Sequence, residues 1–354
     1  MRSLDCNVLV VGAGPAGSCA AREAAAAGAN VLVLERRPVI GVPVQCAEYI
    51  PAPLVGEAGV GRGYIVQYVA GMRTMLNGEP IQELAAPGCM IRRDQFDQAL
   101  AQAAREVGAR YLLDTSAIAF DGRVLTARRR GGEIITIQAD VVIGADGPHS
   151  RVGRWIGSAN ANCVPAAQMR VRLTKPLQYT EVFFDDRIYG GYAWLFPRGD
   201  EANLGLGMLR RDANAPKLGA VLYELLRELA DQGRIERTPV GTSGGWIPAE
   251  APRSIVRERV LLAGDAAGHT HPVTGAGVFQ AVMGGKMAGK WAARAALTGD
   301  LTLLDRYEAE WNEFYGDALE RGFARRQLLE SHPGKLEDII RRCWIGFREY
   351  YGEA

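Results

Sequence analysis

A glycine-rich turn between two apolar segments limits how this chain can fold more than any other feature. Residues 6–11 form a short apolar run typical of a strand buried in a parallel sheet, and the turn at residues 12–17, GAGPAG, follows directly. Residues 18–27 are rich in alanine and favour a helix, and a second apolar segment, residues 31–34, ends at Glu35. The order strand, turn, helix, strand over about 30 residues predicts a βαβ unit.

The spacing Gly12-x-Gly14-x-x-Gly17 is typical of a turn that binds a dinucleotide. Its glycines permit the tight turn, the close approach of backbone to a diphosphate, and close packing of helix on strand. The start of the helix adds free N–H groups and partial positive charge, and Glu35 can accept hydrogen bonds from ribose hydroxyls. A glycine turn without a ligand is the weaker interpretation in this context. The motif alone does not distinguish NAD from FAD.

Glycine and carboxylate residues recur after two other apolar segments. Residues 141–143 are followed by Gly144-Ala145-Asp146-Gly147, and residues 260–263 are followed by Gly264-Asp265. Open α/β sheets bind ligands at the carboxyl ends of their strands. All three segments therefore carry chemistry suited to a ligand site at one sheet edge.

The overall composition excludes several classes of function. Lys and Arg total 41 against 40 Asp and Glu, so there is no basic excess of the kind that nucleic-acid binding requires. No run of about 18 apolar residues escapes interruption by charge, and a membrane-spanning helix is not expected. The six cysteines contain no CxxC pair, which argues against a disulfide framework and against a zinc, iron–sulfur or other metal site. With no recognisable signal peptide, a cytoplasmic location is expected.

The segment that includes residues 260–265 distinguishes FAD from NAD. Residues 259–268, RVLLAGDAAG, resemble the second FAD fingerprint of the para-hydroxybenzoate hydroxylase-like superfamily, in which the aspartate, here Asp265, binds the ribityl chain. Residues 272–277, PVTGAG, precede an expected helix at 278–293, whose N-terminus would face the pyrimidine edge of the flavin. The segment from Gly144 to Ser150 resembles the superfamily's middle motif, and Arg93 matches the arginine that it places near FAD.

Finer features resemble the geranylgeranyl reductase family within that superfamily. Residues 43–48, PVQCAE, are similar to its PxxCxE-type loop, with Ala47 where glycine is common. Residues 191–197, GYAWLFP, followed by GLG at 205–207, resemble its YxWxFP…GxG signature, and residues 150–155 are similar to its version of the middle motif. The resemblance covers roughly residues 5–300 and is specific to the family but not to one substrate.

This resemblance implies a function and a fold. The implied function is an FAD-dependent reductase that saturates carbon–carbon double bonds of an isoprenoid, geranylgeranyl-type lipid or a related apolar substrate. Its electrons would come from NAD(P)H or a reduced redox protein, since the sequence contains no second glycine-rich nucleotide turn. The implied α/β fold is a Rossmann-like FAD-binding domain with an inserted antiparallel β-sheet substrate domain and a helical C-terminus.

The pattern of elements predicts where these parts lie. Segments 64–91 and 166–247 alternate apolar and polar residues and contain turn signals such as Asn77-Gly78, as antiparallel strands do. We therefore expect a discontinuous FAD-binding domain at 1–63, 92–162 and 252–304. The substrate-binding β domain is expected at 64–91 and 163–251, and a helical segment at 305–354.

Two groups of side chains are candidates for the reaction itself. Tyr192, Trp194 and Phe196 alternate along one strand face and would form a wall for an apolar chain or the flavin ring, although core aromatics are an equal alternative. Cys46 is predicted to donate or relay a proton near the flavin, with an inert structural role as the alternative. By resemblance Glu48 is a pocket residue and the second catalytic candidate; by default it is a surface residue.

The remaining predictions concern cofactor contacts and the surface. His269 and His271 are expected to line the pocket, and Lys286, Lys290 and Arg294 form a basic stripe that is either a solvated helix face or a peripheral contact with anionic lipid. The residues predicted to hold FAD are Gly12, Gly14, Pro15, Ala16, Gly17, Glu35, Arg36, Cys46, Arg93, Asp146, Gly264, Asp265, Pro272, Gly275, Ala276 and Gly277.

Two other functions remain open on the sequence. The first is an aromatic hydroxylase of the same fold. The loop at residues 43–48, called the Cys46 loop, and the aromatic strand at residues 191–197 argue against it. A flavin halogenase would need an active-site lysine, and residues 40–100 contain none. The second is an electron-transfer flavoprotein acting on quinone, for which only a version without an iron–sulfur cluster is compatible with the scattered cysteines.

Overall fold

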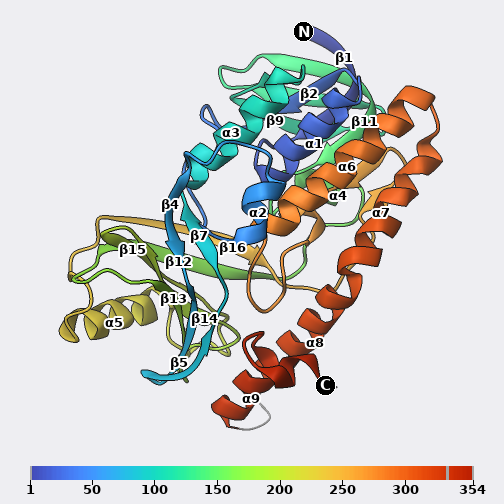
Figure 1. The fold of residues 1–354 in the computed structure, drawn as a ribbon. Helices are drawn as coiled ribbons and strands as arrows, with labels where there is room; N and C mark the ends of the chain where they lie inside the picture. The colour runs from blue at the N-terminus through green and yellow to red at the C-terminus, as the bar shows by residue number, and fades with distance from the viewer. Residues whose placement is uncertain (1, 332–334, 353–354) are drawn as a thin grey trace.

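The computed structural model describes residues 2–331 and 335–352, in which a large sheet carries the glycine-rich turn (Figure 1). This sheet consists of β1 (Arg2–Val11), β2 (Val31–Leu34), β8 (Arg110–Leu112), β9 (Thr115–Phe120), β10 (Val124–Arg129), β11 (Ile134–Gly144), β17 (Val256–Arg257) and β18 (Val260–Leu262). Its central order is β17-β18-β11-β1-β2-β8, and the four pairs from β18 to β8 are parallel. The predicted βαβ unit and the shared carboxyl edge of β1, β11 and β18 are therefore confirmed.

Three helices lie side by side on this sheet: α1 (Pro15–Ala26), α3 (Arg93–Glu106) and α6 (Val278–Thr298) (Figure 1). The middle helix, α1, contacts both of the others. Where α1 meets α6, a Cβ on Gly285 or Gly289 would lie 2.3 Å from the carbonyl oxygen of Ala16 or Ala20. Small residues thus let the two helix backbones approach closely, which brings the starts of α1 and α6 to the same edge of the sheet.

The second sheet has seven strands in the order β16-β12-β15-β14-β13-β5-β6. They are β5 (Gly71–Leu76), β6 (Glu79–Leu84), β12 (Cys163–Arg172), β13 (Tyr179–Phe184), β14 (Tyr192–Arg198), β15 (Glu201–Gly207) and β16 (Gly241–Pro248). The predicted turn at Asn77-Gly78 joins β5 to β6. All pairs are antiparallel except β5 with β13, because β5 enters the sheet from another part of the chain.

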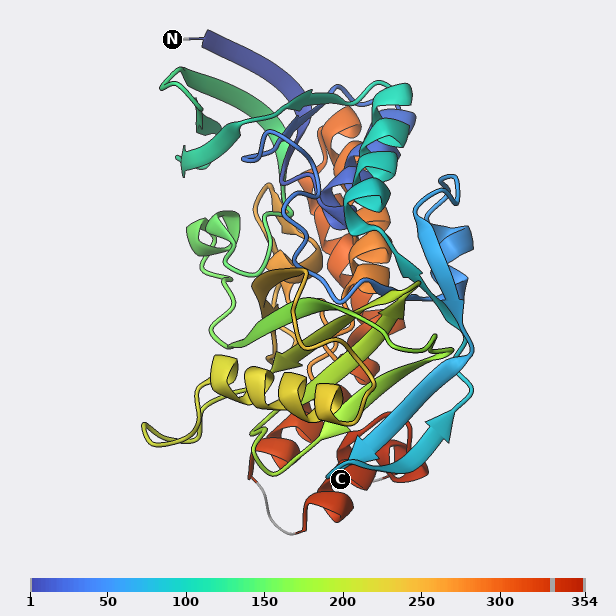
Figure 2. The ribbon, with the colours of Figure 1, turned by 90° about the vertical axis from the view of Figure 1, so that its left-hand side faces the viewer.

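Helix α5 (Leu218–Asp231) lies across the outer face of the second sheet, in front of the strands in Figure 2. Its apolar stripe packs against inward residues of the strands, including Leu195, Leu204 and Leu206. The other face of the sheet is thereby left for the first domain and the C-terminal helices.

The segment at 64–91 is divided between two sheets. Only β5 and β6 join the second sheet, whereas β4 (Ile65–Val69) and β7 (Gly88–Ile91) form a separate three-stranded sheet with β3 (Tyr49–Pro51). The reason is that β3 follows the Cys46 loop and pairs with β7, and β7 runs directly into α3. This small sheet connects the two large ones, next to the short helix α2 (Ala52–Glu57). The domain boundaries themselves stay a prediction.

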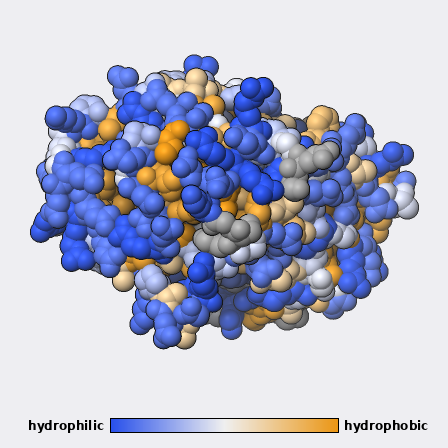
Figure 3. Space-filling model, turned by 90° about the horizontal axis from the view of Figure 1, so that it is seen from below, coloured by the Kyte–Doolittle hydropathy of each residue, from blue (hydrophilic) through white to orange (hydrophobic). Residues whose placement is uncertain are grey.

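The C-terminal segment is helical, as predicted. It comprises η2 (Leu301–Leu304), α7 (Asp305–Trp311), the π-helical turn η3 (Asn312–Gly316), α8 (Asp317–Ser331), α9 (Leu336–Cys343) and η4 (Arg348–Tyr351). It begins beside the first sheet, where the Tyr307 hydroxyl donates to the Leu262 carbonyl at 2.7 Å, and ends beside the second (Figure 1). Viewed from the end that carries α9, the surface is mostly hydrophilic with smaller hydrophobic patches (Figure 3).

The contact between α1 and α6 generates a stability prediction. A Gly289→Ala substitution should lower the free energy of unfolding by about 1–3 kcal/mol, because its Cβ has no room beside the Ala20 carbonyl. The control is Gly219→Ala in α5, where an added Cβ would meet no atom within 4 Å. Urea unfolding of both variants measures the difference, and an equal stability of the two would contradict the packing argument.

Candidate functional site

The glycine-rich turn joins β1 to α1 and is fitted tightly against β11. Gly12 has φ 106°, a conformation that favours glycine, and a Cβ there would lie 2.2 Å from the Ala145 carbonyl oxygen. A Cβ on Gly17 would lie 1.9 Å from the Gly12 carbonyl oxygen. The protein's own packing therefore requires glycine at both positions.

Gly14 has a different environment. Its φ is −74°, which any residue can adopt, and an added Cβ would meet no protein atom within 4 Å. Gly14 is the N-cap of α1, and Pro15 begins the helix, where the missing N–H of proline does no harm. Because the protein itself does not require glycine here, the open space at this helix start fits the diphosphate of a bound dinucleotide.

Glu35 holds the turn from the neighbouring strand end. Its carboxylate accepts hydrogen bonds from the backbone N–H groups of Ala13 and Arg37, both at 2.9 Å. The Arg37 guanidinium continues to the Pro43 carbonyl at 3.1 Å and to Gln45 Oε1 at 2.8 Å. Arg37 thus connects Glu35 to the Cys46 loop, whereas Arg36 is exposed, and its predicted cofactor contact stays a prediction.

Asp146 lies beside the turn, but its carboxylate is occupied by the protein. It accepts hydrogen bonds from Ser150 Oγ at 2.5 Å and from the backbone N–H of Arg151 at 2.7 Å, at the start of α4 (Arg151–Trp155). Its Cα would lie 3.1 Å from a Cβ on Gly12. Asp146 therefore shapes this edge of the site by capping a helix, and a direct contact with FAD stays a prediction.

Asp265 brings β18 and α6 together. It lies in the 3-10 helix η1 (Gly264–Ala267), where its Oδ1 accepts a hydrogen bond from Thr270 Oγ1 at 2.8 Å and lies 3.3 Å from a Cβ position on Gly277, the N-cap of α6. Burial raises the pKa of this carboxyl, while Thr270 and the charge of Arg93 act in the opposite direction. Asp265, the predicted ribityl-binding residue, therefore lies close to Thr270 and to the start of α6.

The turn at 271–277 is held by the substrate sheet and by the C-terminal segment. The Tyr192 hydroxyl donates to the Thr274 carbonyl, and Arg326 donates to the Pro272 carbonyl at 3.0 Å. His271 accepts from the Thr274 N–H through Nδ1 and pairs through Nε2 with the Tyr350 hydroxyl at 2.9 Å. The sequence interpretation assigned no role to Arg326 or Tyr350.

Of the two histidines near this turn, His269 is buried and His271 is half-buried. Burial lowers the pKa of His271 to about 4 and that of His269 well below its usual value. His269 stacks on Trp311 with ring centroids 3.5 Å apart and accepts the Gly264 N–H through Nδ1. His269 contacts η1 and His271 contacts the turn at 271–277. Their place around the pocket stays a prediction.

The Cys46 loop lies against Arg93. The Arg93 guanidinium forms a two-pronged ion pair with Asp97, with both N–O distances 3.0 Å, and the Cys46 sulfur accepts the Glu48 backbone N–H at 3.3 Å. Burial opposes the charge on this guanidinium, but Asp97 and Cys46 raise the pKa of Arg93 above its usual value. Cys46 is half-buried and thus has a permanent positive charge beside its sulfur.

Glu48 is 1% exposed and fully partnered. One carboxylate oxygen accepts the Arg93 backbone N–H at 3.0 Å, and the other accepts from Asn203 Nδ2 and pairs with Arg198 Nε, both at 3.1 Å. The carboxylate therefore joins α3 of the first domain to β14 and β15 of the second. Glu48 is therefore a buried link between these elements and is almost inaccessible to solvent.

The three predicted wall residues form one aromatic cluster. Trp194 lies between Tyr192 and Phe196, with ring centroids 6.0 and 6.4 Å away, and is 6% exposed. Tyr192 also packs at 5.0 Å from Trp344, which follows α9 in the C-terminal segment, while Phe196 packs at 6.1 Å from Tyr49. The C-terminal segment thus completes the aromatic wall beside the turn at 271–277.

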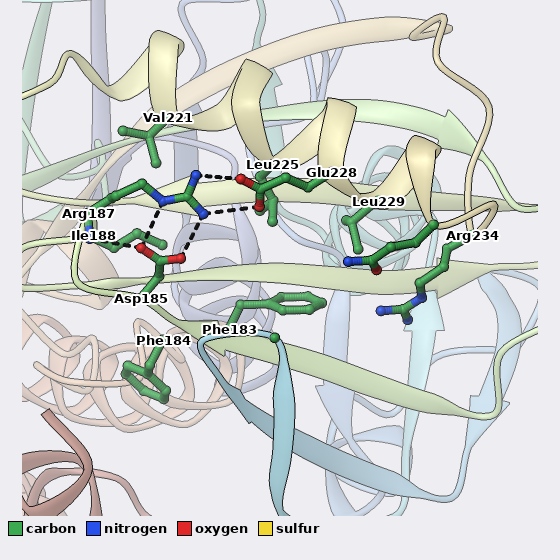
Figure 4. Close-up of a pocket in the computed structure, with 12 residues that line it drawn as sticks. Phe183, Phe184, Asp185, Arg187, Ile188, Val221, Leu225, Glu228, Leu229 and Arg234 are labelled. Atoms are coloured by element: carbon green, nitrogen blue, oxygen red, sulfur yellow. Dashed lines mark hydrogen bonds and ion pairs between the residues drawn. The ribbon is translucent and has the colours of Figure 1, made fainter.

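A small cavity of about 50 Å³ lies elsewhere, beneath α5 (Figure 4). Arg187 is surrounded there by Asp185, Glu224 and Glu228, the nearest oxygen at 2.6 Å, next to Phe183 and Leu225. None of the residues predicted for the site lines this cavity. Its ion pairs attach α5 to the outer face of the sheet and have no contact with the turn.

Comparisons with known proteins agree with this geometry. The family described as FAD binding domain matches residues 64–321, and the NAD(P)-binding Rossmann-like domain matches residues 10–85. The chain is 36% identical to a digeranylgeranylglycerophospholipid reductase of Methanothrix thermoacetophila over 344 residues, covering 90% of this chain and 86% of that protein.

Solved structures give the same picture. A geranylgeranyl bacteriochlorophyll reductase-like protein from Thermoplasma acidophilum superimposes with a TM-score of 0.87 at 27% identity, covering 98% of this chain and 92% of that one. The flavin-dependent halogenase CmlS superimposes with a TM-score of 0.74 at 22% identity, covering 98% of this chain and 68% of that one. The second likeness shows a shared fold alone.

The open space at Gly14 generates a prediction about cofactor binding. A Gly14→Ala variant should fold with wild-type stability but bind FAD at least about tenfold more weakly, because its methyl group enters the diphosphate space and touches no protein atom. Titration of the flavin-depleted protein with FAD, followed by flavin fluorescence, measures the affinity. A Gly12→Ala control should lose both FAD affinity and stability. Unchanged FAD affinity in Gly14→Ala would refute the assignment of this space to the diphosphate.

Proposed function

The chain belongs to the digeranylgeranylglycerophospholipid reductase family of FAD-dependent oxidoreductases, and from this premise we propose that it saturates carbon–carbon double bonds of an isoprenoid lipid. The observation that carries the proposal is the bond between the Tyr192 hydroxyl and the Thr274 carbonyl. It joins the aromatic strand to the turn at 271–277, so that an apolar chain on that wall would lie next to the flavin ring.

Reduced FAD, when bound, supplies the hydride for one carbon of the double bond. The second carbon needs a proton, and we assign its delivery to the Cys46 thiol. The positively charged Arg93 guanidinium interacts electrostatically with Cys46 on this loop. The aromatic wall of Tyr192, Trp194 and Phe196 orients the alkene and keeps water away from it.

Glu48 has a different role in this proposal from the one expected. Both of its carboxylate oxygens are engaged by Arg93, Asn203 and Arg198. We therefore assign it to positioning the Cys46 loop rather than to proton transfer. Electrons reach the flavin from NAD(P)H or a small redox protein that binds transiently, the two donor classes that the sequence allowed.

The reaction has a direct test. The holoprotein is reduced anaerobically and given a geranylgeranyl glycerophospholipid, and mass spectrometry of the lipid should show gains of two hydrogen atoms per saturated bond. A Cys46→Ala variant should keep its FAD and lose about a hundredfold in turnover, because the proton donor is gone. Full turnover in this variant would remove Cys46 from the mechanism.

The same reduced protein also tests the two alternative functions, because each gives a different result. Oxygen insertion into an aromatic acid by the reduced protein in air would identify a hydroxylase and sink the proposed reductase. Rapid reoxidation of the flavin by quinone, with the lipid unchanged, would identify an electron carrier.

We also propose a peripheral contact with the membrane that holds the lipid. Within the described residues, no helix combines the length and apolar character needed to cross a bilayer. Lys286 and Lys290 are paired with Glu57 and Glu310 at 3.0 and 2.9 Å, so the basic stripe is largely neutralised. A shallow hollow beside it is lined by Lys290, Trp291, Arg306, Ala309, Glu310, Glu313 and Phe314.

Phe314 is 64% exposed beside Arg306, a pairing suited to the interface between headgroups and acyl chains. Phe314→Ser should weaken binding of the protein to anionic phospholipid vesicles, measured by sedimentation, by about fivefold, since roughly 1 kcal/mol of apolar contact is lost. The control is Tyr223→Ser on α5, a residue that is 55% exposed. Equal vesicle binding by both variants would place the contact elsewhere.

A further inference from the structure

Side chains of the second sheet hold three successive residues of the Cys46 loop. Gln168 Nε2 on β12 donates to the Cys46 carbonyl at 2.9 Å, and Asn203 Nδ2 on β15 donates to the Ala47 carbonyl at 3.1 Å. The third residue, Glu48, is held by Arg198 and again by Asn203. The loop that carries the thiol is therefore anchored on the sheet through its own backbone.

The same sheet face carries the aromatic wall. Gly205 pairs with Gln168 on one side and with Trp194 on the other, and Asn203 pairs with Phe196. Side chains of directly paired residues on antiparallel strands share a face. Because Gly205 has no side chain, the Trp194 ring lies over it, with ring atoms 2.2 Å from where its Cβ would be. Gln168 and Asn203 thus set the loop's position relative to the wall.

The loop is held from the first domain as well. Arg93 contacts Cys46 through its guanidinium and Glu48 through its backbone N–H. Glu48 has φ 68°, the left-handed region that residues other than glycine rarely adopt. Such a conformation persists in a buried residue only where surrounding contacts fix it, and it is often found where a site must be held in one geometry.

We propose that Gln168 and Asn203 are positioning residues, which fix the carbonyls of Cys46 and Ala47 so that the thiol stays beside Arg93 and in register with the aromatic wall. This rests on the proposed role of Cys46. In the proton transfer the S–H bond breaks, a C–H bond forms, and sulfur keeps the electron pair. A shifted loop moves the thiol away from Arg93 and misplaces the proton relative to the alkene.

The test removes each amide donor without changing side-chain size much. Gln168→Met and Asn203→Leu are compared with Gln67→Met, whose glutamine donates to the Leu177 carbonyl at 2.6 Å and accepts the Gly199 N–H at 3.0 Å but has no hydrogen bond to residues 46–48. Alkylation of Cys46 by iodoacetamide at one fixed pH is followed over time by peptide mass spectrometry, together with FAD content. Turnover and KM for the geranylgeranyl lipid are measured in the same preparations.

The two test variants should keep their FAD, be alkylated at Cys46 about fivefold faster because the loop is held less firmly, and lose about tenfold in kcat with KM changed less than about twofold. Gln67→Met should match the wild type in all four measurements. Test variants with the wild-type alkylation rate and kcat would overturn the inference, as would equal changes in Gln67→Met.

Alkylation of Cys46 needs no lipid substrate. It therefore distinguishes failure of the proposed reaction from failure of the proposed positioning roles. If the wild-type protein saturates no lipid, the proposed reaction fails, whereas faster alkylation of the test variants still shows that Gln168 and Asn203 position the thiol. If it saturates lipid normally and the alkylation rate does not change, the positioning roles fail alone.

Discussion

The arrangement of the site depends on one buried carboxylate, that of Glu48. It accepts a backbone N–H from the start of α3 and binds side chains on β14 and β15, so it lies where the two domains meet. Removing one partner of a buried, hydrogen-bonded charge typically destabilises a protein by about 3–5 kcal/mol, since the other charge is left uncompensated. The relative position of the flavin-binding edge and the aromatic wall is set by this contact together with the small sheet of β3, β4 and β7.

The nucleotide-binding half of the fold was predictable because its constraints are local. Gly12 and Gly17 are required by backbone packing within a single βαβ unit, and Glu35 is reached by the next strand. Short apolar segments followed by glycine and a carboxylate identify strand ends whatever the rest of the chain does. The helix-capping role of Asp146 was not predicted, because a carboxylate near a ligand edge and one that caps a helix look alike in sequence.

The parts that were missed depend on contacts between distant segments. Nothing near Gln168 or Asn203 in the sequence indicates a carbonyl of the Cys46 loop as partner, with separations of 122 and 156 residues. Likewise the division of residues 64–91 between two sheets was not predicted, because the pairing of β7 with β3 is a tertiary contact. The role of the C-terminal segment was hidden for the same reason, although its helical character was readable from composition.

The C-terminal contacts also bear on how the protein is made. The turn at 271–277 is braced by Arg326 and, through His271, by Tyr350, only a few residues from the end of the chain. During synthesis the N-terminal βαβ unit emerges before the aromatic wall, and Arg326 and Tyr350 emerge later than both. The turn at 271–277 therefore has all of its supporting contacts only after these later residues have been made.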